Sequence, residues 1–264
     1  MHSSRREFLT ATGATAVSLA LPLRALSSES KPKKHIITLS FDDGFKKSSI
    51  KTAEIYEKHK LSACINVVAS AHMKDFRPPD YPNVPRGDFG LWNDLKARGH
   101  EIMPHGYKHA NKASLPLAEA KDLILRCLDV FDKELKGFER KTAVFNFPYN
   151  ASKPDLEAWL ATQVLAFRTG GGAINTWPHK GRAKLTCTSS GPGNCEAAID
   201  REIERLLTKA SGWLIFNTHG LDDEGWGPIR ATYLERLLER LTAIDSIEIL
   251  PAGKALAKHA ISAQ

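Results

Sequence analysis

Acidic and histidine side chains gather at three points of this 264-residue sequence, each just after a run of apolar residues. Asp42 and Asp43 follow the first run, and His105 and His109 follow a later one. His219 follows a third. Two histidines four residues apart can face the same way on one helical turn and share a cation. One added carboxylate gives an Asp/His/His set with positions left open for water and substrate, which is typical of a catalytic metal site.

The two adjacent aspartates suit different tasks. Neighbouring carboxylates are costly to keep ionised together unless a cation is near. A metal bound to one of them resolves this cost and leaves the other free to act as a base. Each feature also has a simpler interpretation: Asp-Asp-Gly can be a turn that caps the next helix, a His-x-x-x-His pair is often on the surface, and His219 can be an ordinary loop residue. The three features together favour the catalytic interpretation.

The segments around these residues alternate between strand-like and helix-like patterns. Apolar, β-branched runs predict strands at 35–40, 63–69, 101–103, 142–147, 164–167, 213–216 and 247–250. Helical spacing predicts helices at 48–59, 89–98, 117–135, 154–162, 196–210 and 231–243, with a short helix after the last strand. The segment 173–194 is predicted as a long loop.

Seven strand–helix units in strict order predict an α/β protein with a parallel sheet. A closed or nearly closed barrel and an open, doubly wound sheet both fit this order. In dinucleotide-binding folds a Gly-x-Gly-x-x-Gly motif follows the first strand. No such motif follows the first predicted strand here, which argues against that class. In a parallel barrel the carboxyl ends of the strands meet at one face, where active sites form. The aspartates and the three histidines would therefore lie together.

These motifs resemble those of the polysaccharide deacetylase family, also called the NodB homology domain or carbohydrate esterase family 4. The family's Thr/Ser-Phe-Asp-Asp-Gly motif is present at 40–44. Its His-(Ser/Thr)-x-x-His motif, preceded by Gly-His-Glu-Ile, is matched at 99–109, with glycine in the second place. Its late Leu-x-x-His is matched at 214–219, one residue longer. The resemblance covers roughly residues 36–251.

The resemblance implies a distorted, incomplete (β/α)7-type barrel of parallel strands that holds one divalent metal ion. Zinc is the first expectation, with cobalt and nickel as alternatives. The implied metal ligands are Asp43, His105 and His109. The implied general base is Asp42, and the implied general acid is His219. The implied reaction is the removal of N- or O-linked acetyl groups from an acetylated carbohydrate polymer or oligomer.

The sequence departs from the family at two motifs. The third motif, Arg-x-Pro-Tyr-Gly, is Asn-Phe-Pro-Tyr-Asn at 146–150, and the fourth, an Asp-rich stretch ending in tryptophan, is matched at 173–177 without an aspartate. We expect Arg168 to supply the missing positive charge and Asp222 or Asp223 the missing carboxylate near the acid. The predicted substrate-binding residues are Tyr149, Trp177, Trp226, Arg168 and Asp222. The family places an oxyanion-binding backbone N–H at the position of Tyr149, and each aromatic ring fits rim packing equally well.

The N-terminus predicts an export signal. Residues 4–9, Ser-Arg-Arg-Glu-Phe-Leu, form a twin-arginine signature, and the apolar stretch 11–23 is too short to span a bilayer. We therefore expect a signal over 1–27, a linker over 28–34 and a deacetylase domain over 35–258. The mature protein would be periplasmic or secreted, with no stable membrane insertion. The formal net charge of +7 is spread along the chain without an arginine-rich run, which argues against a nucleic-acid partner.

Three questions stay open in the sequence. Cys187 and Cys195 bracket a Ser/Gly/Pro segment and fit either a disulfide or two free thiols. A glycan-binding pseudoenzyme of the same fold would carry the same motifs, and the altered third and fourth motifs allow it. A related barrel amidase acting on a small C–N substrate is the third function, and twin-arginine export argues against it.

Overall fold

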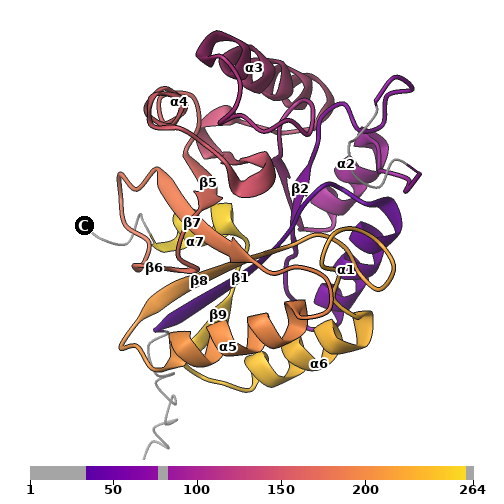
Figure 1. Cartoon of the computed structure of the whole chain (residues 1–264). Coiled ribbons are helices and arrows are strands. Elements are labelled where there is room, and N and C mark those ends of the chain that lie inside the picture. Colours follow the sequence, from indigo (N-terminus) through magenta and orange to yellow (C-terminus); the bar gives the residue numbers. More distant parts are fainter. Residues whose placement is uncertain (1–33, 77–82, 260–264) are drawn as a thin grey trace, which may run out of the picture. The chain divides into compact units, whose positions relative to one another are not determined.

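The computed structural model describes residues 34–76 and 83–259. The chain divides into two compact units, Met1–Ser30 and Lys31–Gln264, and all described residues belong to the second. Their strands are β1 (His35–Phe41), β2 (Cys64–Val67), β3 (Glu101–Pro104), β4 (Val144–Asn146), β5 (Ala166–Gly170), β6 (Ile174–Asn175), β7 (Lys184–Ser189), β8 (Gly212–Thr218) and β9 (Ile247–Ile249). The α-helices are α1 (Lys46–Lys58), α2 (Phe89–Ala97), α3 (Leu117–Glu134), α4 (Pro154–Leu160), α5 (Cys195–Leu207), α6 (Ala231–Thr242) and α7 (Ala252–His259), and two short 3₁₀ helices lie at Arg140–Thr142 and Pro148–Asn150 (Figure 1).

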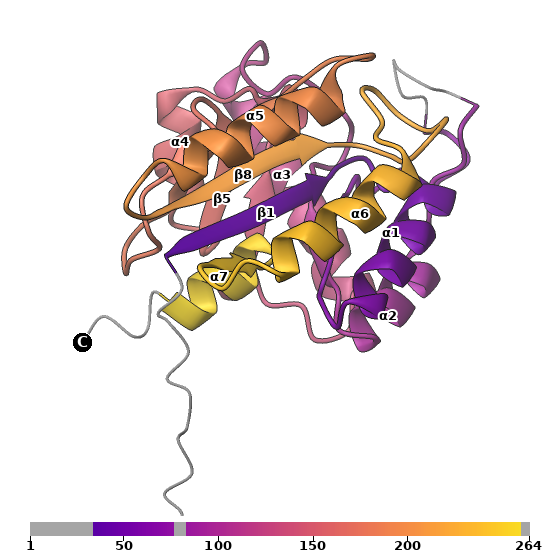
Figure 2. The same cartoon turned by 90° about the horizontal axis from the view of Figure 1, so that it is seen from below.

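The strands form one sheet in the order β3-β2-β1-β8-β7-β5-β4, and all neighbours along this path are parallel. The sheet is nearly closed into a barrel, with one unsealed seam between β3 and β4. β1 and β8 run side by side through the middle of the molecule, with α5 on one side and α6 on the other (Figure 2). This architecture confirms the expected incomplete barrel of parallel strands.

One expectation about the strands was wrong. The segment predicted as a long loop contains β6 and β7, and β7 lies in the barrel wall between β5 and β8. In β7, Leu185 and Cys187 alternate with more exposed residues, and its threonines are β-branched. Its Gly- and Pro-containing flanks concealed this short period-2 pattern. The predicted last strand, β9, pairs only with the first three residues of β1.

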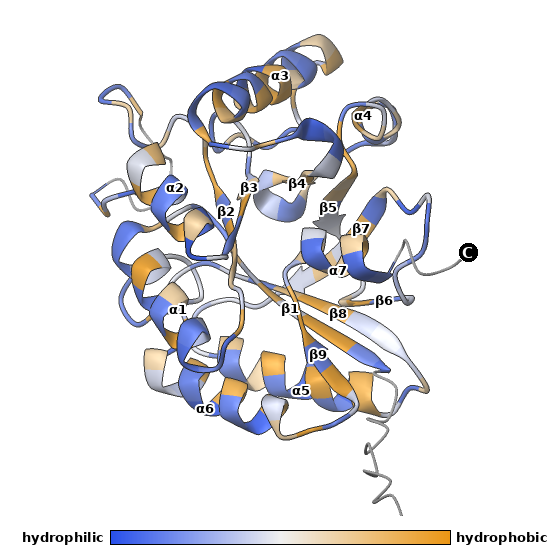
Figure 3. Ribbon diagram, turned by 180° about the vertical axis from the view of Figure 1, so that it is seen from behind, coloured by the Kyte–Doolittle hydropathy of each residue, from blue (hydrophilic) through white to orange (hydrophobic). Residues whose placement is uncertain are grey.

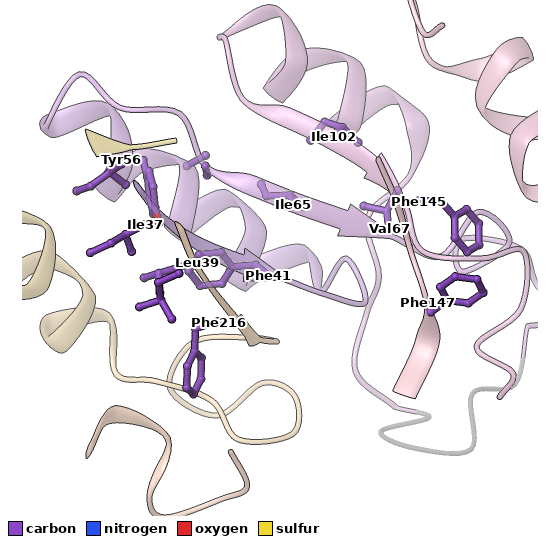
Figure 4. Close-up of a cluster of buried hydrophobic side chains, with 14 of the residues drawn as sticks. Ile37, Leu39, Phe41, Tyr56, Ile65, Val67, Ile102, Phe145, Phe147 and Phe216 are labelled. Carbon is purple, nitrogen blue, oxygen red and sulfur yellow. The ribbon is translucent and has the colours of Figure 1, made fainter. Parts of the chain in front are cut away.

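The two faces of the barrel wall bury different side chains, because successive residues of a strand point to opposite faces. The outer face packs beneath the helices and includes Ile37, Leu39, Phe41, Ile65, Val67, Phe145, Phe147 and Phe216 (Figure 4). A second apolar cluster joins strands from across the barrel and therefore fills its interior; it includes Ile36, Val144, Ala166, Leu185, Trp213 and Ile215. Further along the same inward positions the side chains become polar but stay buried: Ser40, Asp42, Asn66, Asn146, Arg168 and Asn217. The polar end is the carboxyl end of the strands.

The helices cover the outside of the barrel with one apolar face each. In α6, for example, Leu234, Leu237, Leu238 and Leu241 recur at helical spacing and are buried. Hydropathy colouring shows this division between hydrophobic and hydrophilic positions along the helices (Figure 3). Within the described residues, no helix combines the length and the apolar character needed to cross a membrane.

Candidate metal and catalytic site

The turn that ends β1 separates the two aspartates. Asp42 continues the strand pairing, with its N–H donating to the carbonyl of Thr218 at 3.0 Å. Asp43 has φ 76°, in the left-handed region that non-glycine residues rarely adopt. Gly44 follows with φ 66°, and a Cβ atom there would lie 3.0 Å from the ring of Trp92. The backbone therefore sends the two adjacent carboxylates in different directions. Neither caps α1, whose first residues follow Phe45 without a side-chain cap.

Asp43, His105 and His109 form a convergent group of three ligand atoms. Oδ1 of Asp43 lies 3.4 Å from Nε2 of His105 and 3.2 Å from Nε2 of His109. One potential ligand atom from each residue lies within 4.8 Å of the other two. Asp43 and His105 are buried, and His109 is half-buried. The structure thus brings together the three side chains that the sequence predicts as metal ligands.

A hydrogen bond fixes the ring of His105. Its Nδ1 lies 3.0 Å from the backbone carbonyl of Asn146. A carbonyl can only accept, so Nδ1 carries the proton and Nε2 turns its lone pair toward Asp43. Because His105 follows β3 and Asn146 ends β4, this bond also crosses the unsealed seam of the barrel. Such a partner on the far ring nitrogen is the usual way in which proteins orient a metal-binding histidine.

The charges of the group suit a divalent cation. Burial lowers the pKa of His109 to about 4, which keeps its ring neutral at pH 7. Burial alone would raise the pKa of Asp43, but the neighbouring imidazoles outweigh burial and hold that pKa below its usual range. Oδ1 of Asp43 is buried without a hydrogen-bond partner among the described residues. Two imidazole nitrogens and one carboxylate oxygen that converge in this way fit a divalent metal such as zinc.

Asp42 lies beside this group, and three barrel side chains donate hydrogen bonds to it. Nη2 of Arg168 is 2.5 Å from its Oδ2, and Nδ2 of Asn66 is 2.7 Å from its Oδ1. The hydroxyl of Ser40 is 3.4 Å from Oδ1. Burial by itself raises the pKa of Asp42, but the charges of Arg168, His105 and His219 outweigh burial, and the net shift is downward. Asp42 is therefore an ionised carboxylate at neutral pH.

Arg168 supplies the positive charge that the third motif lacks. Asn146 in β4 and Arg168 in β5 are direct register partners. Arg168 therefore lies on the neighbouring strand, at the same level of the barrel as the position where the family has its arginine. Its side chain is 1% exposed and does not line the catalytic cavity. The structure therefore places Arg168 as a partner of Asp42. The structure does not place Arg168 in contact with the cavity, because its side chain is buried against Asp42.

The surroundings of His219 differ from the expectation. Its ring meets that of Trp226 edge-on, with 5.6 Å between centroids, and its Nδ1 is buried without a hydrogen-bond partner among the described residues. Asp222 accepts the N–H of Ala231 at 2.9 Å and so caps α6. Asp223 pairs with a lysine on the surface. Neither aspartate supplies a carboxylate to His219, and Asp222 does not line the cavity as a substrate contact.

A cavity of about 290 Å³ joins these groups; it is lined by Asp42, Asp43, His105, His109, Tyr149, Asn150, Ser189, Asn217, His219 and Trp226. Tyr149 and Trp226 are 47% and 41% exposed and form its rim. The ring of Tyr149 lies 4.5 Å from that of His109. Tyr149 and Asn150 both have positive φ, which marks a strained turn beside the predicted metal ligands.

Trp177 does not belong to this cavity. The preceding strand β6 pairs Asn175 with Trp213, at the start of β8, whereas His219 follows the end of β8. The indole of Trp177 packs against His259, with 4.9 Å between ring centroids. The structure therefore does not bring Trp177 to the predicted site, because β6 places it near the start of β8, at the opposite end of the barrel.

Sequence reasoning missed several polar residues of the site. Asn66 holds Asp42 and in turn accepts a hydrogen bond from Asn146 at 2.8 Å. Asn217, Asn150 and Ser189 line the cavity. The available signal was a polar residue at an inward position of an otherwise apolar strand, as Asn66 in β2 and Asn217 in β8 both are.

The two cysteines whose pairing was open are free thiols in the structure. The thiol of Cys187 donates to Oδ1 of Asn150 at 3.2 Å, on the wall of the cavity. Cys195, at the start of α5, instead contacts the hydroxyl of Thr218 at 3.9 Å.

Comparison of the sequence with known proteins assigns the chain to a family. The family model described as "Polysaccharide deacetylase" matches residues 29–176. The chain belongs to the polysaccharide deacetylase family. No curated protein matches its sequence.

Solved structures share its fold at low sequence identity. The peptidoglycan deacetylase PdaC from Bacillus subtilis is 15% identical, with a TM-score of 0.52 over 85% of this chain and 91% of that one. A family 4 acetyl xylan esterase from Clostridium thermocellum, in complex with a cobalt ion, is 16% identical, with a TM-score of 0.55 over 84% and 90%. A CE4 family pseudoenzyme from Bacillus anthracis is 13% identical, with a TM-score of 0.55 over 85% and 66%. The deacetylase family thus includes an enzyme solved with a metal and a protein described as a pseudoenzyme.

Proposed function

We propose that the protein is a metal-dependent deacetylase that removes acetyl groups from an exported carbohydrate. One observation carries the proposal: Asp43, His105 and His109 converge on one point, and Asp42 and His219 line the same cavity of about 290 Å³. This arrangement offers a metal site, a base and an acid within reach of one bound group.

The residues divide the hydrolysis among them. A divalent metal held by Asp43, His105 and His109 would polarise the acetyl carbonyl and lower the pKa of a bound water. Asp42, ionised and fixed by Arg168 and Asn66, accepts the proton of the attacking water.

The remaining steps fall to the other side of the cavity. Tyr149 lines the cavity, and we propose that its backbone N–H donates to the developing oxyanion, as the resemblance to the family implies. His219, in its protonated form, delivers a proton to the leaving amine or alcohol. The water proton and the leaving-group proton are thereby handled by two different residues.

The rim of the cavity suits a sugar. Tyr149 and Trp226 are exposed aromatic residues that line the cavity, and such rings offer flat apolar faces to a pyranose. Asn150, Ser189 and Asn217 provide hydrogen-bonding groups on the wall. We propose an acetylated oligosaccharide or polysaccharide as substrate. Acetylated xylan and peptidoglycan are the first candidates, because related structures carry those names.

Acetate release tests this proposal. Purified protein with zinc, cobalt or nickel should release acetate from at least one of acetylated xylan, chitin oligomers or peptidoglycan. The His109→Ala variant, which loses a proposed ligand, should release none above background. Absence of acetate release with every metal and substrate would contradict a deacetylase.

The pseudoenzyme remains the second candidate, because His219 lacks a carboxylate at Nδ1 among the described residues. A pseudoenzyme would bind the glycan without releasing acetate. The contacts of Asp42 with Arg168 and Asn66 favour an enzyme, since they keep the base ionised and in place.

We also propose export by the twin-arginine pathway, with a periplasmic or secreted mature protein. Support comes from the sequence at 4–23 alone, which lies outside the described residues. Replacing Arg5 and Arg6 by lysine should leave the precursor in the cytoplasm. Cell fractionation measures the outcome, and normal export of the double variant would contradict the proposed twin-arginine signal.

A further inference from the structure

Lys112 is a buried lysine in the loop between His109 and α3. Its side chain is 0% exposed. Its Nζ donates to the backbone carbonyls of Lys108 at 3.2 Å and of Ala110 at 3.1 Å. These two carbonyls flank His109 on either side, so the ammonium bridges the backbone before and after a proposed metal ligand.

The loop that carries the two histidines has two differently anchored halves. In the first half, the carbonyls of Gly106 and Tyr107 accept the N–H groups of Ala69 and Ser70, at 2.9 and 3.1 Å, just after β2. In the second half the chain turns tightly around His109, where the N–H of Ala110 donates to the carbonyl of Lys108 at 2.7 Å. The turn is then closed by the ammonium of Lys112.

Gly106 makes room for this ammonium. It has φ 87°, and a Cβ atom at that position would lie 3.4 Å from Nζ of Lys112 and 3.2 Å from the carbonyl oxygen of Lys108. A side chain there would crowd both the turn and the ammonium. Glycine in the second place of the His-x-x-x-His motif and a buried lysine three residues after its second histidine therefore fit together.

An ammonium is costly to bury unless hydrogen bonds compensate. Burial lowers the pKa of Lys112 to about 8, which reflects that cost. An apolar side chain would fill the same space without it, but would leave the carbonyls of Lys108 and Ala110 without this donor. The specific gain from the lysine is a fixed backbone on both sides of His109.

We propose that Lys112 is a positioning residue for the metal site, which holds the turn so that Nε2 of His109 faces Asp43. This inference rests on the proposed metal-dependent function. It does not depend on catalysis, because the consequence is a change in metal affinity and in the order of the loop without metal.

The test is cobalt binding to the full chain, followed by the visible spectrum of the ion. Lys112→Met keeps the length and the apolar stem but removes the donor. We expect its affinity for cobalt to be about 10- to 100-fold weaker than that of wild type, the range typical of partners that orient metal ligands. Lys112→Gln keeps a hydrogen-bond donor, and its cobalt affinity should lie between those of wild type and Lys112→Met. If Lys112→Met does not fold, the cobalt affinity of Lys112→Gln is compared with that of wild type instead.

Two variants serve as controls. Lys96 also donates to two backbone carbonyls, those of Lys136 and Gly137, but in the turn after α3. Lys96→Met should bind cobalt like wild type. Leu160→Ala, which empties a buried position of α4, should lower the unfolding temperature without weakening cobalt binding at temperatures where it is folded.

A double variant separates positioning from general damage. If Lys112 acts through His109, then Lys112→Met should weaken binding little further in the His109→Ala background. Metal-free Lys112→Met should also show faster amide exchange at 106–111 than metal-free wild type. Wild-type cobalt affinity in folded Lys112→Met, or an equal loss in both backgrounds, would overturn the inference. If wild type itself binds no metal, the proposed function has failed.

Discussion

The two residues that we propose for proton transfer lie in contrasting surroundings. Asp42 ends a barrel strand and receives hydrogen bonds from Arg168, Asn66 and Ser40, all from inside the barrel. His219 follows β8 in a loop, and its Nδ1 has no partner among the described residues. The proposed base is fixed by barrel side chains, whereas the position of the proposed acid depends on the loop that carries it.

This difference shows how the two changed motifs are tolerated. On the side of the base, the missing arginine at Asn146 is replaced by Arg168, its register partner on the next strand. On the side of the proposed acid, no carboxylate of the described residues contacts Nδ1 of His219 in place of the missing aspartate. Instead the loop is fastened by Glu224, whose Oε2 accepts the N–H of Ser48 at 2.7 Å and its hydroxyl at 2.6 Å. We therefore expect changes around Asp42 to have larger effects than changes around His219.

The largest effect should come from the base itself. Asp42→Asn keeps the shape of the side chain but cannot accept the proton, so kcat should fall by about two to four orders of magnitude with the metal retained. Asp43→Asn should instead lose metal affinity first, and excess metal should partly restore its activity. Metal titration followed by rates at saturating metal checks both. If Asp42→Asn loses the metal while Asp43→Asn keeps it, the two roles are reversed.

The next effect concerns Arg168. Removing one partner of a buried ion pair typically costs about 3–5 kcal/mol, so Arg168→Met should unfold at lower urea concentration. Arg168 lowers the pKa of Asp42, so its loss raises that pKa. Because the proposed base must be ionised to act, the acidic limb of the kcat/KM profile should move to higher pH.

The register pair offers a control for this prediction. Asn146→Arg in the Arg168→Asn background returns the arginine to the neighbouring strand and should recover part of the lost activity. An unmoved acidic limb in Arg168→Met would show that the arginine supports only the fold.

The acid should matter less. His219→Ala should retain metal and lose about two orders of magnitude in kcat, the lower end for an acid or base, because no carboxylate among the described residues contacts its Nδ1. The alkaline limb of the pH–rate profile should change, since the acid must be protonated to act. A pH profile at saturating metal checks this. A loss larger than that of Asp42→Asn would reverse the comparison.

The smallest effects belong to the loop after β8. Glu224→Gln weakens a buried bond to the start of α1 and should cost about 1–3 kcal/mol of stability and less than tenfold in kcat. Asp223→Asn, one residue away, removes only an exposed ion pair with Lys47 and should leave the stability nearly unchanged. Urea unfolding of the two variants side by side measures the difference. Equal losses would mean that Glu224 does not fasten the loop.

The convergence of the proposed metal ligands could be predicted from the sequence because their motifs are local. Asp42 and Asp43 are neighbours, and His105 and His109 lie within one turn of chain, so spacing alone indicates their proximity. The parallel order then places His219 at the same face. For these residues the sequence already predicts which side chains lie together, and the structure adds the distances between them and the tautomer of His105.

The partners of Asp42 could not be predicted in the same way, because they are far apart in sequence and meet only across the barrel. Asn66 looks like an isolated polar residue until β2 is placed beside β1. Arg168 could be suggested as a missing charge, but its burial depends on the register of β4 and β5. Trp177 was misplaced for the opposite reason: a local match to a motif ignored that β6 runs antiparallel to β8.

The most direct test of the account is metal stoichiometry measured together with acetate release. Metal-free protein is titrated with zinc while acetate release from the best substrate is followed. The account predicts that activity rises in proportion to bound zinc up to about one ion per chain and then stays constant, and that His105→Ala shows neither tight binding nor activity. Acetate release that persists after the metal is removed, or wild-type protein that binds no divalent ion at neutral pH, would contradict it.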